Sequence, residues 1–265
     1  RKILDNNPLI RKDQPKRYIG TLSSILTLQI DLGQIDEALE MIQTMRSFSN
    51  KSAFASDDIE LIIFKATALA ELRIYEKMGK YDQAIEAVDH IIEGLETNAA
   101  KINKEQELLF LNSIASAYFG AGRYKESLHW LNRVLNDNET NLRQDIYSYA
   151  RLFNLVVHYE LGNYDLLEYI IKATFRYLSK RHRDHELEVM ILDNMKKLAK
   201  NGGKTDEIEI FKEFKDEFWN HIHNHTDQII LDYFNFPSWI ESKLMGISFA
   251  EAVKLQYDND LAKSA

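Results

Sequence analysis

Five glycines divide this chain of 265 residues at nearly even intervals. Each lies between two amphipathic runs, and successive ones stand 46, 43, 40 and 41 residues apart: Gly33, Gly79, Gly122, Gly162 and Gly203. No proline lies between Pro15 and Pro237, and a proline in the interior of a helix would remove a hydrogen bond and kink it. Glycines at such intervals in a proline-free stretch are typical of a repeat of helical hairpins. The sequence therefore predicts an all-α fold.

The stretch from Leu108 to Val134 shows one such hairpin most clearly. Apolar side chains recur at helical spacing on one face of each of its two helices, which meet at Gly122. The first helix contributes Leu111, Ile114, Ala115 and Tyr118, and the second contributes Tyr124, Leu128, Leu131 and Val134. One hairpin alone cannot bury such a face, so neighbouring hairpins are expected to stack.

The periodic runs predict five hairpins within residues 15–226, followed by a helical cap at 227–257 and a frayed tail at 258–265. Residues 1–14 are expected to form a lead-in or the remnant of an earlier repeat. The cap segment is rich in aromatic residues and is expected to cover the open end of the stack. The predicted hairpins are 15–48, 56–95, 103–135, 142–178 and 185–221.

Alignment on the hinge glycines reveals a shared register. A tyrosine or isoleucine stands two residues after the glycine, a small residue five after it, and an aliphatic residue nine after it. The matching sets are Gly33-Ile35-Ala38-Ile42, Gly79-Tyr81-Ala84-Val88 and Gly122-Tyr124-Ser127-Leu131, and the fourth, Gly162-Tyr164-Leu167-Ile171, has a larger residue at the small position. Glycine permits the tight reversal, and the small residue allows the two helices to approach closely.

This register resembles the tetratricopeptide repeat over most of the chain, roughly residues 15–221. The resemblance implies a right-handed superhelical solenoid of antiparallel helix pairs that binds proteins. The units here are longer than the family's unit of about 34 residues. The small position early in the first helix is Ala115 in the third hairpin, whereas Leu26, Leu72 and Leu155 occupy it elsewhere. The packing between hairpins is therefore expected to differ from that of a consensus array.

Both ends of the chain also resemble segments of a group of large bacterial tetratricopeptide proteins that is common in Bacteroidetes. The segments are Asn7-Pro8-Leu9-Ile10 and Tyr233 to Lys243. That resemblance implies protein–protein interaction without an assigned reaction, and it implies that this chain is the C-terminal part of a longer array.

In the tetratricopeptide family the first helix of each hairpin lines an inner, concave groove. The resemblance therefore implies a set of partner-binding residues in such a groove: Arg73, Glu76, Asn112, Ser116, Phe119, Tyr149 and Tyr159. Asn112 occupies a position that in peptide-binding members hydrogen-bonds the ligand backbone, although it could instead satisfy a neighbouring helix. Ser23 and Thr27 stand where chaperone-binding members have lysine and asparagine, so chaperone docking is not expected.

The composition narrows the classes of partner. The net charge is −8, which does not favour a nucleic-acid groove. The chain contains no cysteine, in keeping with a reducing, cytoplasmic location. No apolar run reaches the roughly 18 residues of a membrane span. Because the sequence begins at Arg1, a preceding segment is expected to have been removed.

The histidines form the one cluster with metal-binding character. His221 and His225 are four residues apart, which would place them on one helical face as a zinc pair requires. The alternative is that they are polar residues at a hairpin end, and this interpretation is preferred. The sequence contains no phosphate loop, nucleophile elbow or dinucleotide motif. We therefore expect neither an enzyme nor a cofactor or bound metal.

Two functions of different kinds remain. The first is a scaffold that holds a partner protein or peptide in the concave groove. The alternative is a repeat domain that senses a peptide or small ligand and controls an effector domain upstream of residue 1. The gene sequence upstream of Arg1 would distinguish them, because further hairpins favour the scaffold and a helix-turn-helix favours the regulator.

Overall fold

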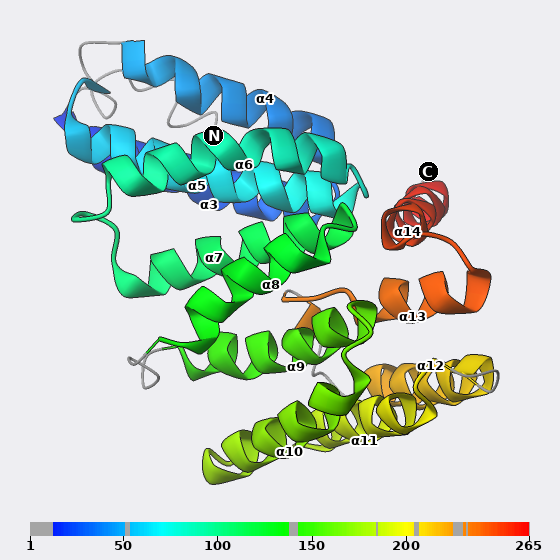
Figure 1. Ribbon diagram of the computed structural model, residues 1–265. Coiled ribbons are helices and arrows are strands. Elements are labelled where there is room, and N and C mark those ends of the chain that lie inside the picture. The colour runs from blue at the N-terminus through cyan, green and yellow to red at the C-terminus, as the bar shows by residue number, and fades with distance from the viewer. Residues whose placement is uncertain are drawn as a thin grey trace. The chain divides into compact units, whose positions relative to one another are not determined.

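The computed structural model describes residues 13–264, apart from 51–53, 138–142, 184, 204–206, 225–229 and 232. All regular elements in the described residues are helical (Figure 1). Between residues 15 and 224 the described helices follow one another in pairs: α3 (Pro15–Asp31) with α4 (Ile35–Arg46), α5 (Asp57–Lys77) with α6 (Tyr81–Thr97), α7 (Lys104–Gly120) with α8 (Tyr124–Leu135), α9 (Gln144–Glu160) with α10 (Tyr164–Lys180), and α11 (Glu186–Asn201) with α12 (Glu207–Asn224). The fold is therefore an all-α, tetratricopeptide-like array of helix pairs.

The helices form two compact units. Unit 1 comprises residues 1–75 and 83–102, and unit 2 comprises residues 76–82 and 103–265. Unit 1 thus holds α3, α4 and most of α5 and α6. In unit 2 each helix from α7 to α12 packs against the next one in the chain.

The hinge glycines adopt the backbone conformation that the sequence pattern requires. All five have a positive φ, between 67° at Gly79 and 76° at Gly203, a region that glycine enters without steric cost. At Gly122 the amide N–H donates to the carbonyl of Phe119 at 2.9 Å, and the N–H of Arg123 donates to that of Tyr118 at 2.9 Å. This pair of bonds satisfies carbonyls that the end of α7 would otherwise leave without partners.

The small residues of the register lie where helices approach each other. Ala38, Ala84 and Ser127 are fully buried. The Ser127 hydroxyl of α8 donates to the Ala115 carbonyl of α7 at 2.7 Å, so two small residues face each other across this pair. Close approach at this position explains why the register calls for a small side chain.

The C-terminal part of the chain forms two further helices, α13 (Phe236–Met245) and α14 (Phe249–Ser264). Residues 258–264, for which the sequence predicts a frayed tail, lie in α14. The expected lead-in lies almost wholly outside the described residues. Asn235 caps α13 by accepting a hydrogen bond from the Ser238 amide at 3.0 Å, and Pro237 occupies the first turn, where a missing N–H has no cost.

Candidate functional site

The seven predicted groove residues are divided between the two units. Arg73 lies in unit 1, where it pairs with Asp31 at 2.8 Å. The other six lie in unit 2. Of these, Glu76 and Ser116 are half-buried, while the remaining four are almost completely buried: Asn112, Phe119, Tyr149 and Tyr159.

The chain's own C-terminal segment, from Tyr233 onwards, covers these four side chains. The Tyr233 ring stacks on that of Tyr149, with centroids 4.7 Å apart. The Phe234 ring lies 5.1 Å from that of Phe119, and Trp239 lies 5.6 Å from Tyr159. Aromatic residues of one segment therefore contact predicted groove residues of α7 and α9 in turn. We call the surface formed by Asn112, Phe119, Tyr149 and Tyr159 the inner face of α7 and α9.

Asn112 contacts the backbone of the C-terminal segment. Its side-chain amide donates to the backbone carbonyl of Tyr233 at 3.5 Å, which is a long hydrogen bond. The Asn112 carbonyl oxygen is buried and has no hydrogen-bond partner among the described residues. The C-terminal segment thus lies against Asn112, the residue for which the family resemblance implies a peptide contact.

A polar cluster holds the start of this segment. The Arg143 guanidinium donates to the Asp145 carboxylate at 2.8 Å and to the Tyr233 hydroxyl at 2.9 Å. The Tyr233 hydroxyl donates in turn to Asp145. Partial burial alone would raise the pKa of Asp145, but the hydrogen bonds from Arg143 and Tyr233 outweigh it and lower that pKa to about 2. The pKa of the Tyr233 hydroxyl is raised by burial and by the adjacent carboxylate.

This cluster leads to a pH-dependent prediction for Asp145→Asn. The pKa of Asp145 is lower in the folded state than its ordinary value of 3.8, so its stabilising effect is present above about pH 4 and is lost as the pH falls towards 2. After allowance for solvent screening we expect a contribution of about 1 kcal/mol. In urea titrations between pH 5 and pH 3 the stability gap between wild type and Asp145→Asn should narrow.

Asp89→Asn is the matched control over the same pH range, because Asp89 is an exposed residue of α6. A gap between wild type and Asp145→Asn that stays constant or widens towards pH 3 would contradict the assignment.

A second polar cluster holds α13. Glu160, at the end of α9, accepts from the Trp239 indole N–H at 2.6 Å and from the Lys243 ammonium at 2.6 Å. The Glu160 side chain is only 8% exposed. A buried carboxylate needs such partners, and through them Glu160 ties the end of α9 to Trp239 and Lys243 of α13.

A partner peptide could bind the inner face of α7 and α9 only in competition with the C-terminal segment. The segment is covalently attached, so its effective concentration at that face is on the order of millimolar. A free peptide that made the same contacts at micromolar concentration would be outcompeted by about a thousandfold. A partner peptide would therefore have to displace the segment to reach this face.

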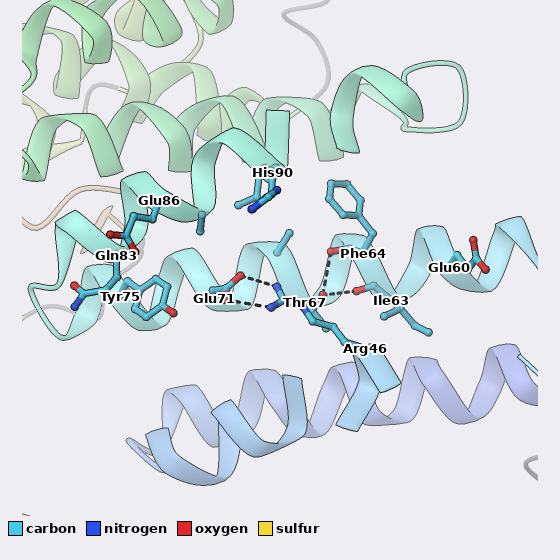
Figure 2. Close-up of a pocket in the computed structure, with 13 residues that line it drawn as sticks. Arg46, Glu60, Ile63, Phe64, Thr67, Glu71, Tyr75, Gln83, Glu86 and His90 are labelled. Atoms are coloured by element: carbon cyan, nitrogen blue, oxygen red, sulfur yellow. Dashed lines mark hydrogen bonds and ion pairs between the residues drawn. The ribbon is translucent and has the colours of Figure 1, made fainter. Parts of the chain in front are cut away.

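An open cleft lies in unit 1, between α5 and α6 (Figure 2), with a volume of about 570 Å³. The helices are close at one end, where a Cβ on Gly94 would overlap the Phe64 ring, and the cleft extends from there towards the α5–α6 turn. Its apolar part is lined by Ile63, Phe64, Ala68, Ala87 and Ile91.

The polar part of the cleft contains an ion pair that spans its edge. The Arg46 guanidinium, from the end of α4, donates to the two carboxylate oxygens of Glu71 at 2.5 and 3.3 Å (Figure 2). Burial and the Glu71 charge raise the pKa of Tyr75. The lining is completed by Glu60, Thr67, Gln83, Glu86 and His90. An apolar floor with a few polar groups is the usual composition of a binding site.

Sequence reasoning missed this cleft. Within the hairpin register Glu71 and Glu86 are ordinary surface positions of α5 and α6, and no motif distinguishes them. The nearest signal was the predicted groove residue Arg73, which lies on α5 but does not line the cleft.

The described residues contain no group of three or more histidine, aspartate or glutamate side chains that could hold a metal ion. His221 is half-buried, with its Nδ1 atom 4.0 Å from the Glu186 carboxylate. His225, the other member of the suggested zinc pair, lies outside the described residues.

A family model for the tetratricopeptide repeat matches residues 69–93. The match spans the second half of α5, the hinge at Gly79 and most of α6, and together with the repeated helix pairs it supports a relationship to the tetratricopeptide repeat family. Proteins of this class generally mediate protein–protein interaction and are typically non-enzymatic scaffolds. No curated protein matches the chain. Among the described helices, none is both long and apolar enough to cross a bilayer.

Proposed function

We propose that the chain is an interaction scaffold that binds a segment of a partner protein in the α5–α6 cleft. The observation that carries the proposal is that an open, mixed apolar and polar cleft lies in the hairpin that the repeat model matches. The inner face of α7 and α9 keeps a binding role in this proposal, but its ligand is the chain's own C-terminal segment.

The proposal is tested by filling the cleft. Ala87 is half-buried in the cleft wall, so Ala87→Phe places a ring in the space that a ligand would occupy. Peptides selected by phage display on the wild-type chain should bind it in calorimetric titrations and should bind Ala87→Phe at least tenfold more weakly.

Ala262→Phe is the matched control, since Ala262 is an exposed residue of α14, and its affinity for the selected peptides should equal that of the wild type. Circular dichroism spectra should show that both variants are folded. If the selected peptides bind Ala87→Phe as tightly as wild type, the cleft is not the binding site.

A further inference from the structure

We infer that the α5–α6 cleft selects segments in which a lysine or arginine stands next to an apolar side chain. This inference rests on the proposed function and specifies its ligand. It follows from three features of the cleft: the charges that line it, its apolar wall and its aromatic rings.

The charges in the cleft favour a cation. Four charged side chains line it: Arg46, Glu60, Glu71 and Glu86. Arg46 and Glu71 neutralise each other through their ion pair. Glu60 and Glu86 are exposed and, within the described part of the chain, take part in no ion pair. The cleft therefore offers a carboxylate on each helix, Glu60 on α5 and Glu86 on α6, to positive groups of a ligand, whereas a ligand carboxylate would be repelled.

The apolar wall favours a long, amphipathic side chain. Ile63 and Ile91 are buried and face the cleft from α5 and α6, and the small Ala68 and Ala87 leave room between them. Lysine and arginine can bury their aliphatic stems against such a surface and keep the charged end at the rim. A neighbouring leucine or phenylalanine of the ligand would gain roughly 1.5–3 kcal/mol from full burial.

Two aromatic rings strengthen the preference for a cation. Phe64 and Tyr75 both line the cleft, near its two ends. The faces of such rings attract ammonium and guanidinium groups, with roughly 0.5–1 kcal/mol of stabilisation at exposed sites. Arg46 already holds the Glu71 carboxylate, so the polar groups beside Tyr75 are in position before a ligand binds.

The test compares two fluorescein-labelled peptide pools by fluorescence polarisation. Both pools have random sequence with leucine and phenylalanine fixed at two positions, and between these one pool has lysine where the other has glutamate. We expect the lysine pool to bind the wild-type chain at least tenfold more tightly than the glutamate pool. Raising the salt concentration should weaken this preference, because the carboxylates are exposed.

Charge reversal then locates the preference. Glu60→Lys and Glu86→Lys should each weaken binding of the lysine pool about fivefold, and the double variant should bind the glutamate pool more tightly than the lysine pool. Glu93→Lys is the matched control, because Glu93 is an exposed residue of α6 that does not line the cleft. It should change the affinity for the lysine pool less than twofold.

The outcomes separate the inference from the function on which it rests. Equal binding of the two pools, or tighter binding of the glutamate pool, overturns the charge preference, and if Ala87→Phe abolishes that binding the proposed function stands. If neither pool binds while the phage-selected peptides do, the inference alone fails. If Ala87→Phe binds both pools and the selected peptides as the wild type does, the proposed function fails and the inference falls with it.

Discussion

Truncation after Thr226 is expected to abolish the cooperative folding of unit 2. The deletion removes side chains that are almost fully buried against α7 to α12, among them Phe234, Phe236, Trp239 and Ile240. Loss of one large side chain from a core costs about 3–5 kcal/mol, and typical domains have only about 5–15 kcal/mol of stability in total. Because the deletion also exposes the inner faces of α7 and α9, we expect a sharply reduced helix signal and aggregation.

Truncation after Tyr257 is the control for this experiment. It removes only the last part of α14, where the described side chains are exposed, so we expect a change in unfolding free energy within about 0.5 kcal/mol. The two truncated proteins are compared by circular dichroism and urea denaturation. A chain that ends at Thr226 and still unfolds cooperatively with wild-type stability would show that the C-terminal segment is an addition to the fold rather than part of its core.

Trp239→Ala is expected to lower the free energy of unfolding by about 3–5 kcal/mol. The Trp239 ring is fully buried and lies 5.4 Å from the ring of Phe211 and 5.6 Å from that of Tyr159. The substitution leaves a cavity among these rings and also takes away the indole hydrogen bond to Glu160. The loss is measured by urea denaturation at neutral pH.

Tyr169→Ala provides the comparison, since Tyr169 is a large aromatic residue of α10 that is 65% exposed. A surface substitution of this kind should change stability by no more than about 0.5 kcal/mol. If Trp239→Ala and Tyr169→Ala had similar effects, Trp239 would not belong to the core that the structure shows.

The helix pairs could be predicted from sequence because their signals are local. Each signal acts within one hairpin. Examples are the positive φ of Gly122, the small residue Ser127 five positions later and the apolar face of each helix. The absence of proline from the stretch between Pro15 and Pro237 is equally local. These features determine where helices end and which faces they bury, so the all-α fold of helix pairs could be predicted.

The position of the C-terminal segment could not be predicted in the same way. The sequence shows that residues 227–257 are rich in aromatic side chains and predicts that they cover the end of the stack. The observed contacts of the segment join Asn112 to Tyr233 and Tyr159 to Trp239. Partners so distant in the chain leave no periodic pattern in a single sequence. The sequence therefore predicts a set of groove residues but not the segment that lies against four of them.

The α5–α6 cleft was missed for a related reason. Consensus packing would bring the two helices of a hairpin together along their length. Here the Phe64 ring lies against Gly94 at one end, and the small residues Ala68 and Ala87 face the space between the helices. The repeat register gives no sign that both of these positions lack a larger side chain.

The central claim is that the inner face of α7 and α9 is occupied by the chain itself, which leaves the α5–α6 cleft for partners. Hydrogen–deuterium exchange of the full chain, with and without the lysine peptide pool, tests it most directly. The account predicts slower exchange on peptide addition within residues 57–97 and no change within 104–160 or 233–253. Slower exchange in α7 and α9 together with faster exchange in residues 233–253 would mean that the peptide displaces the segment, and would contradict the account.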